Sequence, residues 1–146
     1  MLNNCCIICE NDPSAHSFKT IYSVNPNIHL FYSCPASASQ YYDSSGVIHH
    51  FTNTINAIEK PWVYILDCSG FTFQHASQIY TSIQIAKKVL EKSDILKKIY
   101  IVNYTWSMKI IINAIWFLLP ESIIQKITYS ENTVINLQHN YLIDII

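Results

Sequence analysis

The sequence feature that most constrains the fold is an apolar run at residues 61–67, PWVYILD, which ends in a carboxylate. Strands buried on both faces of a parallel sheet carry near-continuous apolar runs, whereas half-exposed strands alternate polar and apolar residues. A second run of this kind occupies residues 97–104, KKIYIVNY. Because parallel strands need a crossover connection, usually a helix, the two runs predict an α/β fold.

The neighbouring segments complete the predicted sheet and its helices. Residues 18–24 and 28–34 are rich in β-forming side chains and flank the turn sequence NPN, which predicts a hairpin. A final strand is expected at 123–129. Apolar residues at helical spacing predict helices at 47–58, 76–90, 107–119 and 131–141. We therefore predict a single domain, residues 1–146, with a mixed, largely parallel sheet of five or six strands and helices packed over it.

The composition argues against several classes of function. The chain has 146 residues, two glycines, nine lysines, no arginine and a net charge of -1. Scarce glycine removes the loops that cradle nucleotide phosphates, and the lack of arginine argues against nucleic-acid binding. The most apolar window, residues 110–119, is far shorter than the roughly 20 residues that span a bilayer. We expect a cytoplasmic protein with reduced cysteines.

The tetrapeptide CIIC at residues 6–9 matches the CxxC pattern of metal and redox sites. A structural zinc site needs four ligands, and Cys34 and Cys68 lie far apart and form no second pair. We therefore favour a core strand with buried thiols over a metal or redox site. His49 and His50 are neighbours in a predicted helix, so they point about 100° apart and cannot both face one metal. We expect both to face solvent, and we predict no metal site.

Residues that could support catalysis are few. Asp67, Ser69 and His75 supply the residue types of an acyl-transfer triad, but the chain has no GxSxG turn and no evident oxyanion donors. No two carboxylates have a spacing that suggests glycosidase chemistry. We therefore predict no catalytic residues and a protein that is not an enzyme.

The predicted helix at 107–119 is apolar almost all round, and Lys109 and Asn113 are its polar interruptions. Such a helix is either buried on every side or faces a nonaqueous phase. Two interpretations stay open: a core or dimer-interface helix, and a lid between a lipid-filled cavity and a membrane. Trp106 and Trp116 fit the lid, because indoles favour the headgroup level of a membrane.

Three segments in series resemble CRAL-TRIO lipid-binding domains. They are WVYILDCSGFTFQHA at 62–76, KIYIVN at 98–103, and residues 110–127, which end in LLPESIIQKI. In order and spacing the resemblance covers residues 61–129. It implies a sheet that floors a hydrophobic cavity, a gate helix that admits one lipid, and a minimal domain without the helical module that usually precedes it.

The resemblance also implies a headgroup site. In phosphatidylinositol-binding members a Lys and a Glu meet the inositol phosphate, and the matching positions here are Lys126 and Asp94. The family's neighbouring Thr is replaced by Ile123, and the Arg that often follows the Glu is replaced by Ile95. An inositol-type site is therefore partly kept.

The expected cavity and gate residues are apolar or aromatic and lie on the two buried strands and on the gate helix with its following turn. Members that also bind phosphatidylcholine have Ser and Thr where this chain has Trp62 and Tyr64, which argues against a choline-type site. The expected set is Trp62, Tyr64, Tyr100, Val102, Trp106, Ile111, Ile115, Trp116, Phe117, Leu119 and Ile123.

The function predicted from the resemblance is binding of one phospholipid, with phosphatidylinositol as the first candidate, and its transfer between membranes. The expected partners are the phospholipid and, transiently, a membrane surface; no other cofactor and no nucleic acid are expected. A monomer is favoured over a dimer. The alternative is a small α/β protein-interaction module or enzyme whose helix at 107–119 forms a dimer interface.

Overall fold

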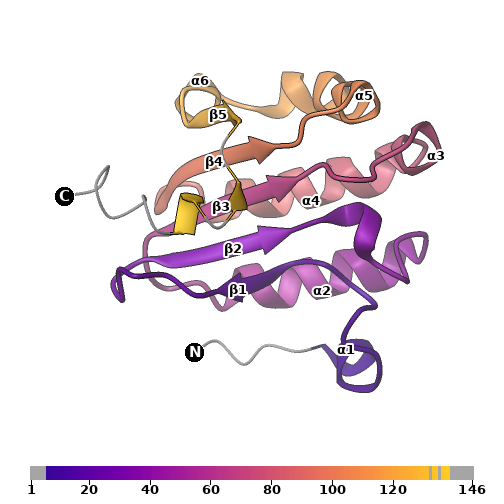
Figure 1. Ribbon diagram of the computed structural model, residues 1–146, viewed down its shortest axis with the longest axis horizontal. Helices are drawn as coiled ribbons and strands as arrows, with labels where there is room; N and C mark the ends of the chain where they lie inside the picture. Colours follow the sequence, from indigo (N-terminus) through magenta and orange to yellow (C-terminus); the bar gives the residue numbers. More distant parts are fainter. Residues whose placement is uncertain (1–5, 132, 135, 139–146) are drawn as a thin grey trace.

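The computed structural model describes residues 6–131, 133, 134 and 136–138, and its centre is a five-stranded sheet in the order β1-β2-β3-β4-β5 (Figure 1). β1 pairs antiparallel with β2, and β2 to β5 pair in parallel, which confirms the predicted mixed sheet. The strands are β1 (Lys19–Ile21), β2 (His29–Ser33), β3 (Trp62–Asp67), β4 (Leu96–Val102) and β5 (Ile127–Ser130). The α-helices are α1 (Ile7–Asn11), α2 (Ser44–Asn56), α3 (Phe73–Ala76), α4 (Ile79–Glu91), α5 (Trp106–Ile115) and α6 (Glu121–Ile124), and the 3-10 turns are η1 (Pro35–Ser37) and η2 (Trp116–Leu118).

The order of the parallel strands decides where the helices lie. Each parallel strand sits beside the one before it in the sequence, so the sheet grows in one direction from β2 to β5. Crossovers between parallel strands are right-handed, so successive crossovers in one direction place their helices on the same face. Accordingly α2 contacts α4, and α4 contacts α5. Figure 1 shows α2 and α4 together behind the strands.

Side chains alternate between the two faces of the sheet. On β3, Trp62 and Tyr64 point toward the helices and join the main core, whereas Val63 and Ile65 point to the opposite face. Leu137, from the C-terminal part of the chain, packs on that opposite face. All four β3 side chains are buried, as the near-continuous apolar run predicts for a central strand.

Short polar segments set the ends of the elements. Asp43 caps α2, and its carboxylate accepts a hydrogen bond from the backbone N–H of Gly46 at 3.3 Å. In the turn between β1 and β2, the side-chain oxygen of Asn25 accepts from the N–H of Asn27 at 3.0 Å. After β3 the chain turns at Gly70, whose φ of 73° is one that glycine adopts without a steric cost. The predicted hairpin turn is thereby confirmed.

The prediction of a core strand at residues 6–9 is wrong. Cys6 is the N-cap of α1, its sulfur accepts a hydrogen bond from the N–H of Cys9 at 3.4 Å, and both thiols are buried. Residues three apart lie on one face of a helix, whereas in a strand they would point to opposite faces. One helical turn therefore buries both cysteines on the same side.

The prediction that His49 and His50 both face solvent is wrong for His50. His49 is exposed, but His50 is buried in the same helix. Val47, Phe51 and Thr54 are buried as well, so the inward face of α2 follows the i, i+3, i+4, i+7 spacing and includes position 50. The neighbouring imidazoles do point apart, and one of them points into the protein.

Three other predicted elements are each divided in the structure. The segment predicted as one strand at 123–129 begins with the short helix α6 and becomes β5 from Ile127. The helix predicted at 76–90 is divided into α3 and α4, and the helix predicted at 107–119 becomes α5 followed by the 3-10 turn η2. Val134 and residues 136–138 are helical, and the remainder of the closing helix predicted at 131–141 lies partly outside the described residues.

Candidate functional site

An apolar cavity of about 160 Å³ lies between the sheet and the helices α2, α4 and α5. Tyr64, Leu66, Ile99 and Ile101 form its floor, because alternate side chains of β3 and β4 point to the helix-covered face. The helices supply walls that are almost entirely apolar. The wall residues include Val47, Phe51, Ile85, Ala86, Val89, Met108, Ile111, Ile112 and Ile115.

The polar side chains that line the cavity are mostly engaged elsewhere. The hydroxyl of Tyr41 donates to the carbonyl oxygen of His75 at 2.6 Å, and Thr81 Oγ1 lies 2.6 Å from Ser44 Oγ. Ser33 is different: its Oγ is buried and has no hydrogen-bond partner of good geometry within the described part of the chain. The cavity therefore offers a bound molecule an apolar wall and few polar contacts.

Tyr64 is the titratable group on the cavity floor. Burial raises the pKa of its phenol well above the ordinary range, and the nearby Ser33 hydroxyl offsets this rise only in part. The phenol is consequently neutral at physiological pH. The floor therefore carries no charge that would repel an acyl chain.

The volume limits what the cavity can hold in this conformation. An apolar cavity of roughly 150 Å³ accommodates a molecule the size of benzene, and sites for drug-sized ligands occupy about 300–1,000 Å³. The cavity of about 160 Å³ therefore fits a short apolar group, not a whole phospholipid. A larger ligand requires one wall to move.

The wall formed by α5 and the following turn η2 has two contrasting faces. Its inner face packs Met108, Ile111 and Ile112 against the cluster that contains Phe71 and Ile101. Its outer side leaves large apolar side chains in contact with solvent: the exposed fraction is 76% for Trp106 and for Phe117, 40% for Ile110 and 39% for Trp116. One side of this segment is therefore buried and the other is exposed to solvent, although both sides carry apolar side chains.

The predicted cavity and gate residues divide into two groups. Five of them line the cavity: Tyr64, Ile111, Ile115, Leu119 and Ile123. The other six do not line it. Trp62 belongs to the core and donates through Nε1 to the carbonyl oxygen of Lys92, Tyr100 and Val102 point to the opposite face of the sheet, and Trp106, Trp116 and Phe117 lie on the outer side of α5 and η2.

The predicted headgroup residues lie near each other at the start of β4 and β5. Lys126 Nζ donates to the carbonyl oxygen of Ser93 at 3.0 Å, and the exposed Asp94 is the next residue. Lys126 also falls between two cavity-lining residues, Ile123 and Ile127. This end of the sheet is opposite the end at which Asp67 lies, because β3, β4 and β5 are parallel.

Asp67, at the carboxyl end of β3, accepts several hydrogen bonds from neighbouring residues. It accepts from Tyr32 at 2.8 Å, from the Ser69 hydroxyl at 2.7 Å and N–H at 3.0 Å, and from Asn103 at 3.0 Å. Burial disfavours its charged form, but the bonds from Asn103, Ser69 and Tyr32 outweigh burial and lower its pKa. These hydrogen bonds give the carboxylate a structural role at the end of β3.

The residues considered for acyl transfer do not form a triad. The Ser69 hydroxyl donates to Asp67 itself, and Nδ1 of His75 accepts from the N–H of Thr72 at 2.9 Å. A triad requires the serine hydroxyl to donate to the imidazole. The nearby Cys68 is not an activated nucleophile either, because burial raises its pKa to about 12.

The sequence reasoning missed the contribution of α4 and of the N-terminal segment. Ile85, Ala86 and Val89 line the cavity from α4, and His16 reaches it from the loop before β1. The apolar face of the helix at 76–90 was visible as a periodic pattern. Nothing in that pattern distinguishes a face that packs tightly from one that borders a cavity.

The fold and the cavity define an α/β domain in which helices lie over an apolar cavity on one face of a mixed sheet. A protein-family model described as the divergent CRAL/TRIO domain matches residues 25–135, which is more than half of the chain. The chain belongs to the divergent CRAL/TRIO domain family, and membership indicates binding of a lipid or another small ligand. A comparison with curated proteins found no match.

Proposed function

We propose that this protein binds a phospholipid with an acyl chain in the cavity beneath α5 and transfers it between membranes, with phosphatidylinositol as the first candidate. The observation that carries the proposal is the apolar cavity of about 160 Å³ lined by α2, α4, α5 and the sheet. Each CH₂ group removed from water contributes about 0.8 kcal/mol, so an apolar cavity that covers part of an acyl chain makes a lipid carrier energetically feasible.

Entry of a whole lipid requires α5 to move away from the sheet. The contacts that hold α5 are apolar side chains, including Met108 and Ile111, and apolar packing is not directional. The apolar outer side, with Trp106 and Phe117, can enter a membrane while the inner face opens toward the lipid. None of the helices in the described part of the chain is long and apolar enough to cross a bilayer.

Lys126 is the proposed contact for the phosphate of the headgroup. In the sequence it lies between the cavity-lining residues Ile123 and Ile127, although it does not line the cavity itself, and its ammonium group donates to the carbonyl oxygen of Ser93, the residue before Asp94. Because the chain has no arginine, a lysine must supply any side-chain contact to phosphate that requires a fixed positive charge. The Asp94 carboxylate is proposed to accept hydrogen bonds from inositol hydroxyls.

The proposal is tested by native mass spectrometry of the protein purified from cells, followed by transfer assays between liposomes. We expect a co-purifying mass that matches a phospholipid. The variant Ala86→Phe places a ring in the cavity from α4 and should remove that mass. Lys87→Phe is the matched control, because it places the same ring at an exposed position one residue further along the helix.

The result also separates the carrier from the alternative function. A clean dimer without a bound lipid would favour a protein-interaction module that pairs through the exposed aromatic side chains of α5 and η2. If Ala86→Phe retained as much lipid as Lys87→Phe, the cavity would not be the lipid-binding site.

A further inference from the structure

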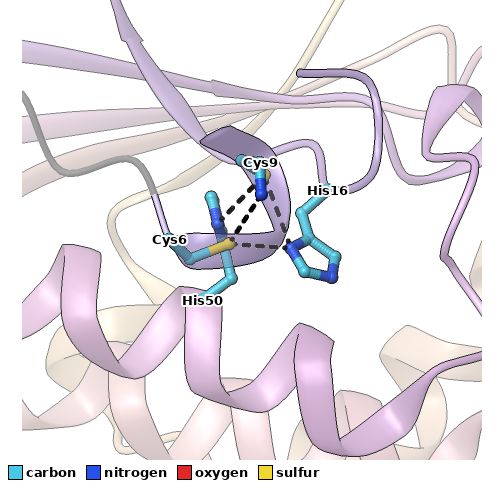
Figure 2. Close-up of side chains that lie close together, drawn as sticks. All are labelled: Cys6, Cys9, His16 and His50. Atoms are coloured by element: carbon cyan, nitrogen blue, oxygen red, sulfur yellow. Dashed lines mark hydrogen bonds between the residues drawn. The ribbon is translucent and has the colours of Figure 1, made fainter. Parts of the chain in front are cut away.

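We propose that Cys6, Cys9, His16 and His50 form a structural zinc site. This proposal does not depend on the lipid binding proposed for the cavity. The four side chains are buried, and one potential ligand atom from each lies within 4.8 Å of those from the others. Figure 2 shows the two thiols and the two imidazoles converging from α1, from the loop that follows it and from α2. Two Cys and two His are a ligand set that zinc favours in closed, structural sites.

The sulfur–nitrogen distances fit tetrahedral coordination. Nδ1 of His16 lies 3.4 Å from Cys6 Sγ and 3.6 Å from Cys9 Sγ, and Nδ1 of His50 lies 3.7 Å from Cys9 Sγ. With Zn–S bonds of about 2.3 Å and Zn–N bonds of about 2.0–2.1 Å, a tetrahedral ion separates a sulfur from a nitrogen by about 3.6 Å. The side chains therefore already have nearly the spacing that the ion requires.

The backbone orients one of the imidazoles for metal binding. Nε2 of His50 lies 2.8 Å from the carbonyl oxygen of Phe18, which can only accept, so Nε2 carries the hydrogen. Nδ1 of His50 is then left with its lone pair, and this is the atom that faces Cys9. A carbonyl that fixes the tautomer in this way is a common outer-shell partner of a metal-binding histidine.

Without a metal, the contacts among these four buried side chains are weak. Thiols are weak hydrogen-bond donors, and two thiols and two imidazoles meet here in a buried site. Coordination would replace weak sulfur–nitrogen contacts with four metal–ligand bonds, so a bound ion would stabilise the arrangement.

The site would fasten the N-terminal segment to α2 and thereby support the cavity. His16 lines the cavity, and the next ring along the chain, Phe18, stacks on Phe51 of α2 with centroids 4.3 Å apart. Phe51 is itself a wall residue. All four coordination positions are filled by protein groups, so the role we propose for the ion is structural and not catalytic.

Elemental analysis of the full chain, purified without chelator, tests the proposal. We expect about one zinc per chain, and we expect Co²⁺ in place of zinc to give the visible absorption of a tetrahedral thiolate site. Wild-type protein that neither retains zinc nor binds added Zn²⁺ or Co²⁺ would overturn the site. A mass two hydrogens lower, from a disulfide between Cys6 and Cys9, would overturn it as well.

Variants assign the ligands. Cys6→Ser should reduce zinc retention against a chelator at least tenfold, and serine still caps α1, so the loss would not reflect a missing cap. The controls are Cys34→Ser, a buried cysteine outside the cluster, and His49→Ala, the exposed neighbour of His50. Both should keep the wild-type zinc content, and a chelator should lower the unfolding temperature of wild type but not of Cys6→Ser. Stoichiometric zinc in Cys6→Ser would overturn the ligand assignment, whatever the outcome of the lipid assays.

Discussion

Phe117→Asp separates a membrane-facing role of the η2 turn from a role in the core. The Phe117 side chain is 76% exposed, so the substitution removes little folded-state packing. Surface changes of this kind usually alter the free energy of unfolding by less than about 0.5 kcal/mol. For a domain of this size that corresponds to a melting-temperature shift below about 2 °C.

The expected loss of membrane binding is larger. Burial of a whole Phe side chain contributes about 1.5–3 kcal/mol, and the exposed three quarters of Phe117 would contribute about 1–2 kcal/mol in a membrane. A loss of that size weakens partitioning roughly 5- to 30-fold, since each 1.4 kcal/mol is a factor of ten. The carboxylate of Asp adds a further cost of leaving water.

Co-sedimentation with anionic liposomes and the rate of lipid transfer measure the effect, and thermal unfolding monitors the fold. Tyr22→Asp is the matched control, because Tyr22 is 70% exposed and follows β1, at the sheet edge opposite β5. Ile111→Asp, at a buried position of α5, should instead fail to fold. Unfolding of Phe117→Asp, or transfer equal to that of Tyr22→Asp, would refute the lid and favour an interface or core role for α5.

Three further predictions concern the headgroup site and the strand ends. Lys126→Ala should slow phosphatidylinositol transfer by roughly tenfold or more through loss of a charged hydrogen-bond donor, while the exposed Lys60→Ala should not; equal rates would remove Lys126 from the site. Asp67→Asn should lower the free energy of unfolding by about 1–3 kcal/mol in denaturant titrations at neutral pH. Because folding lowers the pKa of Asp67, its stabilisation is present above the unfolded pKa of about 3.9 and is lost as the pH falls through the folded pKa, so wild type and variant should converge in acid. Gly70→Ala, at a φ of 73°, should lower stability by about 1–2 kcal/mol, and an unchanged melting temperature would contradict the strain assigned to it.

The local pattern of the sequence determined the elements of this fold. The apolar run at 61–67 becomes the central strand β3, and the NPN turn joins β1 to β2. Each of these features depends on residues a few positions apart, so chain chemistry alone is sufficient to predict them. The family resemblance was also detectable in the sequence, because its motifs lie along consecutive elements.

Pairing and packing between distant segments decided the candidate site. Alternation along β4 predicts that Ile99 and Tyr100 point to opposite faces, but the crossovers decide that the face of Ile99 is the one covered by helices. For the same reason Tyr100 and Val102, chosen for their apolar character, lie away from the cavity. The inner and outer faces of an all-apolar helix likewise cannot be told apart until a neighbour covers one of them.

The cysteine–histidine cluster shows the same division. The CIIC pattern suggests two ligands, but a strand and a helical turn were both compatible with four residues, and the helix alone places both sulfurs on one side. His50 follows Cys9 by 41 residues, so no local spacing joins them. They meet because α2 packs its inward face against the N-terminal segment, and that contact depends on the burial of apolar surface over the whole domain.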